Sequence, residues 1–94
     1  MPTNPTVIHR EFTIRNRQGL HARPAAMLVK LCNTFLSEIW IEKGDEQING
    51  KSIMGLMMLA ANCGSVIKVS AEGADAEEAL TKIGALVESG FMEE

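Results

Sequence analysis

The order of two apolar periodicities along the chain constrains its fold more than any other feature. In some segments apolar residues occupy alternate positions, as in strands, and in others they recur every three or four positions, as in helices. Strands are predicted at residues 7–15, 37–43, 46–48 and 66–71, and helices from Ala22, from Ile53 to Ala61 and from Ala76. Helices packed on one face of a sheet make a two-layer sandwich, so this β-α-β-β-α-β-α order predicts the α+β class.

Capping residues set the expected ends of the helices. Ser52 is expected to cap the second helix, which should end at residues 63–64, where a glycine stands in a favoured stop position. Asp75, with Glu78 three residues later, fits a capping box at the start of the last helix. Gly90 is expected to end that helix.

Length and charge bound the classes of protein that this chain can belong to. Its 94 residues suffice for a single domain, and residues 1–6, with two prolines, are expected to be a flexible lead-in. A net charge of −3 lacks the basic footprint of a nucleic-acid-binding protein. No apolar run approaches the roughly 18 residues of a membrane span, and the N-terminus lacks a secretory signal. We therefore expect a cytoplasmic protein that neither binds nucleic acid nor inserts into a membrane.

The two cysteines, Cys32 and Cys63, lie in apolar, helix-like stretches without the spacing of metal ligands. They are expected to be buried as small apolar side chains rather than to form a disulfide or a zinc site. The sequence predicts no metal and no cofactor.

The stretch 19–25, Gly-Leu-His-Ala-Arg-Pro-Ala, places His21 at the expected start of the first helix. A helix N-terminus leaves about four backbone N–H groups without partners and carries partial positive charge, which together attract an anion. Pro24 is compatible with the first turn, where its missing N–H costs no hydrogen bond. Arg23 adds a permanent cation that can reach phosphate oxygens. Because a neutral imidazole is a competent nucleophile, the pattern indicates a histidine that carries phosphate.

Plainer interpretations of the two histidines remain open at this point. His21 can serve only to cap the helix, since many polar residues occupy such a position. A metal-ligand role is disfavoured, because His9 lies on a predicted strand without a supporting carboxylate cluster. His9 itself is expected to be an exposed strand residue.

A second candidate site lies on the helix that follows Ser52, although an N-cap serine needs no further explanation. This helix carries more large apolar residues than one buried face can hold. Ile53 is expected to face the core with Leu56, so that Met54 and Met57 are partly exposed. An exposed apolar patch on a small domain indicates a docking site, and methionines that fill the core are the alternative. A phosphate on Ser52 would add negative charge beside this patch.

Two motifs resemble the HPr family, the histidine-containing phosphocarrier proteins of the phosphoenolpyruvate-dependent phosphotransferase system. They are the stretch at 19–25 and Lys-Ser-Ile-Met-Gly-Leu-Met at 51–57. His21 and Ser52 are 31 positions apart, which fits the two phosphorylation sites of the family. The similarity extends from about Val7 to Phe91. It implies a βαββαβα open-faced sandwich, with a four-stranded antiparallel sheet and three helices on one face.

The resemblance also implies a role for each site residue. His21 would accept a phosphoryl group on Nδ1 from phosphorylated enzyme I and pass it to an enzyme IIA component, with Arg23 stabilising that group. The chain would then be a carrier with a phosphohistidine intermediate rather than a free-standing enzyme. Ser52 matches the serine that HPr kinase/phosphorylase modifies. The implied partner-docking surface comprises Leu20, Ile53, Met54 and Met57. A monomer is the simplest state for transient hand-offs.

The tail at residues 89–94 resembles the nitrogen-related paralogue NPr, which leaves the sugar and nitrogen branches open. Two further hypotheses stand beside the sugar-uptake carrier. One is a regulatory binding module, in the nitrogen branch or in catabolite control, that is switched by phosphorylation of Ser52. The other is a structural domain that is modified at neither site. The presence of His21 argues against a regulator that works through the serine alone.

Overall fold

The computed structural model describes residues 7–92, and the expected lead-in at residues 1–6 lies outside them. The order of elements is the predicted one. The elements are β1 (Val7–Thr13), α1 (Ala22–Cys32), β2 (Glu38–Lys43), β3 (Glu46–Asn49), α2 (Ile53–Leu59), β4 (Val66–Glu72), α3 (Ala76–Glu88) and a short 3-10 turn, η1 (Gly90–Met92).

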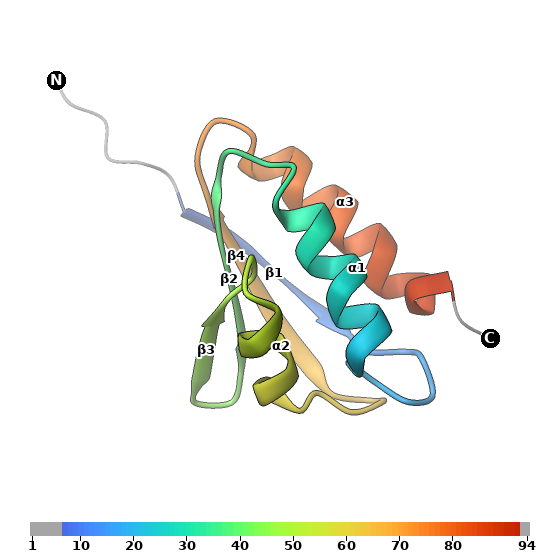
Figure 1. Cartoon of the computed structure of the whole chain (residues 1–94). Coiled ribbons are helices and arrows are strands. Elements are labelled where there is room, and N and C mark those ends of the chain that lie inside the picture. Colours follow the sequence, from blue (N-terminus) through green and yellow to red (C-terminus); the bar gives the residue numbers. More distant parts are fainter. Residues whose placement is uncertain (1–6, 93–94) are drawn as a thin grey trace, which may run out of the picture.

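The four strands form one antiparallel sheet in the order β1-β4-β2-β3. The N-terminal strand thus pairs with the last one, Phe12 opposite Ile67, and β4 also pairs with β2, Ile39 opposite Ala71. All three helices cover the same face of the sheet, with α1 and α3 lying alongside each other and α2 beside the β2-β3 hairpin (Figure 1). The prediction of an α+β open-faced sandwich is therefore confirmed.

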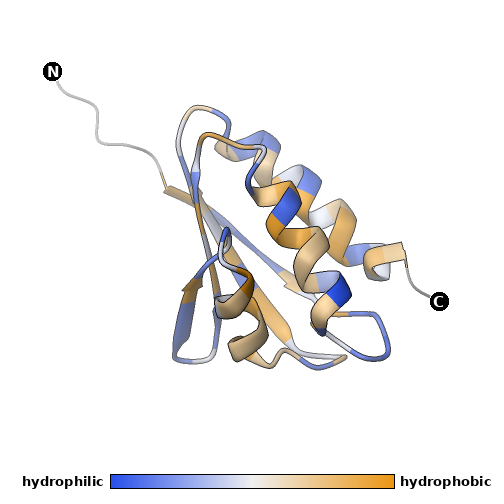
Figure 2. Ribbon diagram, in the orientation of Figure 1, coloured by the Kyte–Doolittle hydropathy of each residue, from blue (hydrophilic) through white to orange (hydrophobic). Residues whose placement is uncertain are grey.

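The core lies between the sheet and the helices. Alternate residues of the strands, such as Ile39 and Ile41 on β2, are buried on the helix side, as strand geometry requires. The helices α1 and α3 bury one stripe each and leave polar residues outside, which Figure 2 shows as alternating colours along both helices. At Gly84 of α3 a Cβ would approach the Phe12 ring to 2.6 Å, so a glycine allows α3 to lie close against β1.

The second helix is shorter than predicted. It ends at Leu59, and Ala60 adopts the left-handed conformation with φ of 54°. Gly64, with φ of 92°, belongs instead to a separate turn, in which the backbone N–H of Asn62 donates to the Ser65 hydroxyl at 3.1 Å. Cys63 lies on this turn and is exposed, so the prediction that both cysteines are buried is correct only for Cys32.

The expected capping box at the start of α3 is wrong. Asp75 occupies the N-cap position, but its carboxylate makes no bond to the first turn. It accepts hydrogen bonds from the backbone N–H groups of Leu36 at 2.8 Å and Ser37 at 2.9 Å, and from the Ser37 hydroxyl at 2.5 Å. These bonds, the Ser37 hydroxyl first, lower the pKa of Asp75. Glu78 forms an ion pair with Lys82 at 3.0 Å instead of reaching back to the cap.

Candidate functional site

The first helix begins at a histidine that does not cap it. His21 occupies the N-cap position in extended backbone, with φ of −87° and ψ of −169°, and its imidazole makes no capping hydrogen bond to the first turn. Pro24 is buried in that turn and contributes no N–H. The interpretation of His21 as a side-chain cap is therefore wrong, and the half-buried ring stands at the positive end of α1.

The loop before His21 is fixed against the segment that follows α2. The backbone N–H of Leu20 donates to the carbonyl of Ala61 at 2.8 Å, and the Asn16 amide donates to the carbonyl of Gly19 at 2.7 Å. Gly19 has φ of 71°, and a Cβ at this position would lie 2.5 Å from the Ala61 oxygen. Only glycine fits both the backbone conformation and the contact, so its presence sets the direction in which His21 leaves the loop.

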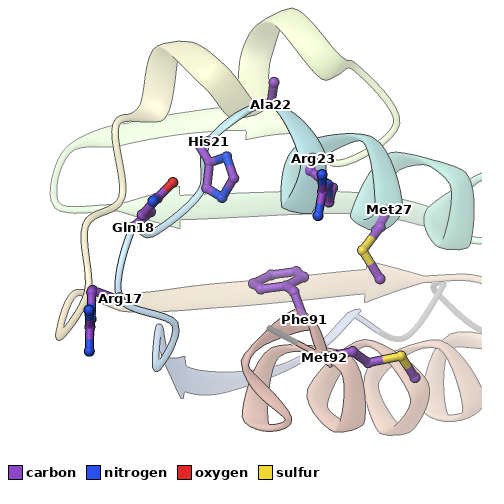
Figure 3. A pocket seen from close by; sticks show the side chains of 8 residues that line it. All are labelled: Arg17, Gln18, His21, Ala22, Arg23, Met27, Phe91 and Met92. Carbon is purple, nitrogen blue, oxygen red and sulfur yellow. The ribbon is translucent and has the colours of Figure 1, made fainter. Parts of the chain in front are cut away.

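His21 lines an open hollow of about 810 Å³ at the surface, which we call the His21 hollow. Figure 3 shows its walls, which come from the loop before α1, the first turns of α1 and the C-terminal turn η1. Its lining residues are Arg17, Gln18, His21, Ala22, Arg23, Met27, Phe91 and Met92.

The hollow brings the two residues predicted for phosphate chemistry together and adds others. Arg23 lines it with His21, so a guanidinium and an imidazole share one small space. Gln18, to which the sequence analysis gave no role, directs its amide toward the histidine side of the hollow (Figure 3). Arg17 contributes a second cationic residue. Two arginines in one hollow favour a negatively charged ligand group, because guanidinium matches the geometry of phosphate oxygens.

The C-terminal wall of the hollow was missed by sequence reasoning. Gly90, Phe91 and Met92 have φ of 70°, 57° and 61°, so three consecutive residues adopt the left-handed conformation. The Phe91 side chain is 1% exposed, whereas that of Met92 is 80% exposed. The glycine was the only signal in the sequence, and it indicated a helix end rather than a wall of the site.

At the second site, the prediction that Ser52 caps α2 is confirmed. Its hydroxyl accepts a hydrogen bond from the backbone N–H of Gly55 at 3.1 Å. This bond satisfies one of the roughly four N–H groups that lack a partner at the start of a helix, and the helix that it caps has only seven residues.

The outer side of α2 is apolar and exposed. Leu56 and Leu59 face the core, and the other large side chains face solvent, so both the expectation of a buried Ile53 and the alternative of core-filling methionines are wrong. Figure 2 shows apolar colours along the turns of this helix. We call this surface the α2 apolar face; its members and their exposed fractions are Ile53 (41%), Met54 (71%), Met57 (48%) and Met58 (73%).

Leu20 does not belong to a docking surface. Its side chain is 5% exposed and packs in the core, although His21 next to it lines the hollow. Adjacent residues of an extended segment point in opposite directions, so the residue beside an exposed histidine faces inward. The assignment of Leu20 to partner docking is corrected accordingly.

Within residues 7–92 no group of three His, Cys, Asp or Glu side chains could hold a metal ion. Burial raises the pKa of the Cys32 thiol to about 12, with Lys51 nearby opposing the shift. His9 is exposed on β1, as predicted. Among the described helices none is both long and apolar enough to cross a membrane.

Comparison with known proteins agrees with this arrangement. The family model described as PTS HPr component phosphorylation site matches residues 8–89. Phosphocarrier protein HPr of Neisseria meningitidis is 42% identical over 87 residues, which cover 93% of this chain and 98% of that protein. HPr-like protein Crh of Bacillus subtilis is 42% identical over 87% of this chain and 96% of its own length. The crystal structure of HPr from Thermoanaerobacter tengcongensis superposes with a TM-score of 0.89, at 48% identity, and covers 93% of this chain and 98% of that one. The chain therefore belongs to the HPr family of phosphocarrier proteins of the phosphotransferase system.

Proposed function

We propose that this protein accepts a phosphoryl group on Nδ1 of His21 from phosphorylated enzyme I and passes it to an enzyme IIA component in the cytoplasm. One observation carries the proposal: the imidazole at the start of α1 does not cap the helix and shares a hollow with Arg23. The family assignment supports the same chemistry.

The proposed transfer needs only groups that the hollow already contains. The lone pair of a neutral imidazole nitrogen attacks phosphorus, and the bond from phosphorus to the donor breaks with its electron pair leaving on the donor. Arg23, which lines the hollow with His21, would offset the negative charge of the phosphoryl oxygens, and Arg17 adds a second positive charge to the wall of the hollow. Positioning and electrostatics account for most of the catalysis of phosphoryl transfer, so no metal ligand is required from this chain.

The α2 apolar face supports the proposal as the surface on which enzyme I and enzyme IIA components dock in turn. Its four side chains are exposed on a small domain, where an apolar patch most often marks a binding site. Methionine side chains adapt to partners of different shape because they are unbranched and polarizable. One face can therefore serve two partners, and a monomer suffices for the hand-off.

Regulation by HPr kinase/phosphorylase at Ser52 is a further part of the proposal. Ser52 directly precedes Ile53 and Met54, so a phosphate on its hydroxyl would stand at the edge of the α2 apolar face. The added charge would repel an acidic partner surface and would be costly to desolvate against an apolar one.

A reconstituted relay tests the carrier function. The protein is incubated with enzyme I and labelled phosphoenolpyruvate, purified at alkaline pH, and then mixed with an enzyme IIA component. We expect label on the protein in the first step and on the acceptor in the second. His9→Ala is the matched control, because His9 is the other of the two histidines and lies exposed on β1. Label that remains on His21→Ala, or label that never leaves the wild-type protein, contradicts the proposal.

The second candidate function is a regulatory binding module, in a nitrogen branch or in catabolite control. It is favoured by the position of Ser52 beside the α2 apolar face and by the relative named HPr-like protein Crh. Its test compares the affinity of Ser52→Asp and Ser52→Ala for enzyme I and for a candidate regulator. A selective change for the regulator supports the module, and equal affinities of both variants for every partner count against it.

A further inference from the structure

The C-terminal turn η1, which lines the His21 hollow, contains two residues with side chains in the unfavourable left-handed conformation. Gly90 accepts φ of 70° without a penalty, but Phe91 and Met92 have side chains and still adopt φ of 57° and 61°. L-residues rarely adopt this conformation because Cβ then approaches the following carbonyl oxygen. Such outliers persist only where surrounding contacts impose them, and they cluster at functional sites.

The burial of the Phe91 ring holds this turn in place. Phe91 is 1% exposed, although it is the second residue from the end of the described range 7–92, and it lines the hollow together with His21 and Met27. Figure 3 shows the ring lying across the base of the hollow, between the first turns of α1 and the end of α3. The ring therefore gives a polar hollow an apolar floor.

The sequence of hydrogen bonds before the turn fixes where the ring lies. The backbone N–H of Ser89 donates to the carbonyl of Ala85 at 3.0 Å, and its hydroxyl donates to the carbonyl of Leu86 at 2.8 Å. These bonds close the last turn of α3, and the left-handed residues of η1 follow it directly and pack against it. Met92, which is 80% exposed, stands at the rim where the ring ends.

We propose that Phe91 is a positioning residue whose ring limits the access of water to a phosphoryl group on His21. The inference rests on the proposed function. The competing reaction is hydrolysis: a water oxygen bonds to phosphorus, the P–N bond breaks with its electron pair left on the imidazole, and the proton of the water passes to that nitrogen or to solvent. An apolar floor excludes water from one side of the phosphoryl group. It also offers no hydrogen-bond acceptor that would orient the water molecules remaining in the hollow.

The test uses a pair of side chains of similar size and opposite polarity, Phe91→Leu and Phe91→Gln. Wild type and both variants are phosphorylated with phosphoramidate, a small phosphoryl donor, so that no partner protein is needed. The loss of phosphohistidine is then followed by 31P NMR between neutral and alkaline pH. We expect Phe91→Leu to decay at nearly the wild-type rate and Phe91→Gln to decay about fivefold faster.

Two controls separate water access from a loss of stability. Leu80→Ala creates a cavity beneath α3, the helix that precedes η1. It does not alter the hollow, since Leu80 is fully buried and does not line it. It should leave the decay rate unchanged. If Phe91→Gln does not unfold cooperatively, Phe91→Asn replaces it, because asparagine is polar and tolerates the left-handed conformation. Equal decay of the polar and apolar variants, or equally fast decay of Leu80→Ala, overturns the inference. A wild-type protein that takes no label on His21 from phosphorylated enzyme I contradicts the proposed function itself.

Discussion

The helices α1 and α2 begin in the same way and use their first residue differently. His21 and Ser52 both occupy an N-cap position in extended backbone. The Ser52 hydroxyl accepts a hydrogen bond from the Gly55 N–H, whereas the His21 imidazole makes no capping bond to its helix. The Ser52 side chain caps its helix, whereas the His21 side chain lines the hollow. Substitution of Ser52 should therefore affect mainly stability, and substitution of His21 mainly phosphoryl transfer.

The lengths of the two helices explain why this difference is tolerated. The helix α1 has eleven residues and buries Ala25, Leu28 and Cys32 against the sheet and its neighbours. The helix α2 has seven residues and buries only Leu56 and Leu59. Short helices are marginal without capping and packing, so α2 should depend on its cap more than α1 does.

The largest effect is expected from His21→Ala, which removes the nucleophile and no capping bond. Phosphoryl acceptance should be lost completely, while the free energy of unfolding changes by no more than about 0.5 kcal/mol. Urea unfolding followed by circular dichroism measures the second quantity. A loss of several times that size would mean that the imidazole supports the helix, and the contrast with Ser52 would fail.

Arg23→Ala tests whether the cation in the hollow acts on the transferred group. We expect the rate of phosphoryl transfer to fall about 100-fold, as when one charge-stabilising group is removed from an active site. Single-turnover transfer from enzyme I measures it, with Arg17→Ala as the matched variant from the same hollow. If Arg17→Ala is the slower of the two, the roles of the arginines are reversed.

Ser52→Ala should show the opposite pattern to His21→Ala. Loss of the cap should lower the free energy of unfolding by about 1 kcal/mol, whereas Ser52→Gly should lower it by only about 0.3 kcal/mol. Labelling of His21 by phosphoramidate should stay at the wild-type rate, because this donor requires no docking on α2. A reduced labelling rate would show that the two helix starts are coupled.

Asp75 extends the comparison to a third helix start, where the side chain serves neither the helix nor the hollow. Its pKa is lowered in the folded protein, first by the Ser37 hydroxyl, so its ionised form stabilises the fold. That contribution is complete above the unfolded pKa of about 3.9 and is lost as the pH falls through the lower folded pKa.

The stability difference between wild type and Asp75→Asn should therefore be constant near neutral pH and shrink below about pH 4. Urea unfolding across this range measures it, with Glu77→Gln as a control on the exposed side of the same helix. A difference that grows on acidification would reverse the assigned sign.

What could be predicted from the sequence depended on how local the deciding contact is. The Ser52 cap spans three residues, and the prediction held. The capping box at Asp75 did not form because donors from another part of the chain compete for the carboxylate: the N–H groups of Leu36 and Ser37, 39 and 38 positions away, bind it instead. No periodicity or motif reports a contact of that kind.

The site divides in the same way. His21 and Arg23 lie within one heptapeptide, and their shared hollow follows from the start of a single helix. Phe91 enters that hollow from the other end of the chain, through a left-handed turn that favours glycine and is here adopted by a phenylalanine. The prediction that Leu20 belongs to the docking surface was wrong although Leu20 is adjacent to His21. Adjacency in a motif does not fix the side of an extended segment on which a side chain lies.

The most direct test of the central claim is the intact mass of the protein after incubation with enzyme I and phosphoenolpyruvate, measured at alkaline pH for wild type, His9→Ala and His21→Ala. We predict one acid-labile phosphoryl group on wild type and on His9→Ala, and none on His21→Ala. A phosphoryl group on His21→Ala, or its absence from all three proteins, would contradict the assignment of His21 as the carrier.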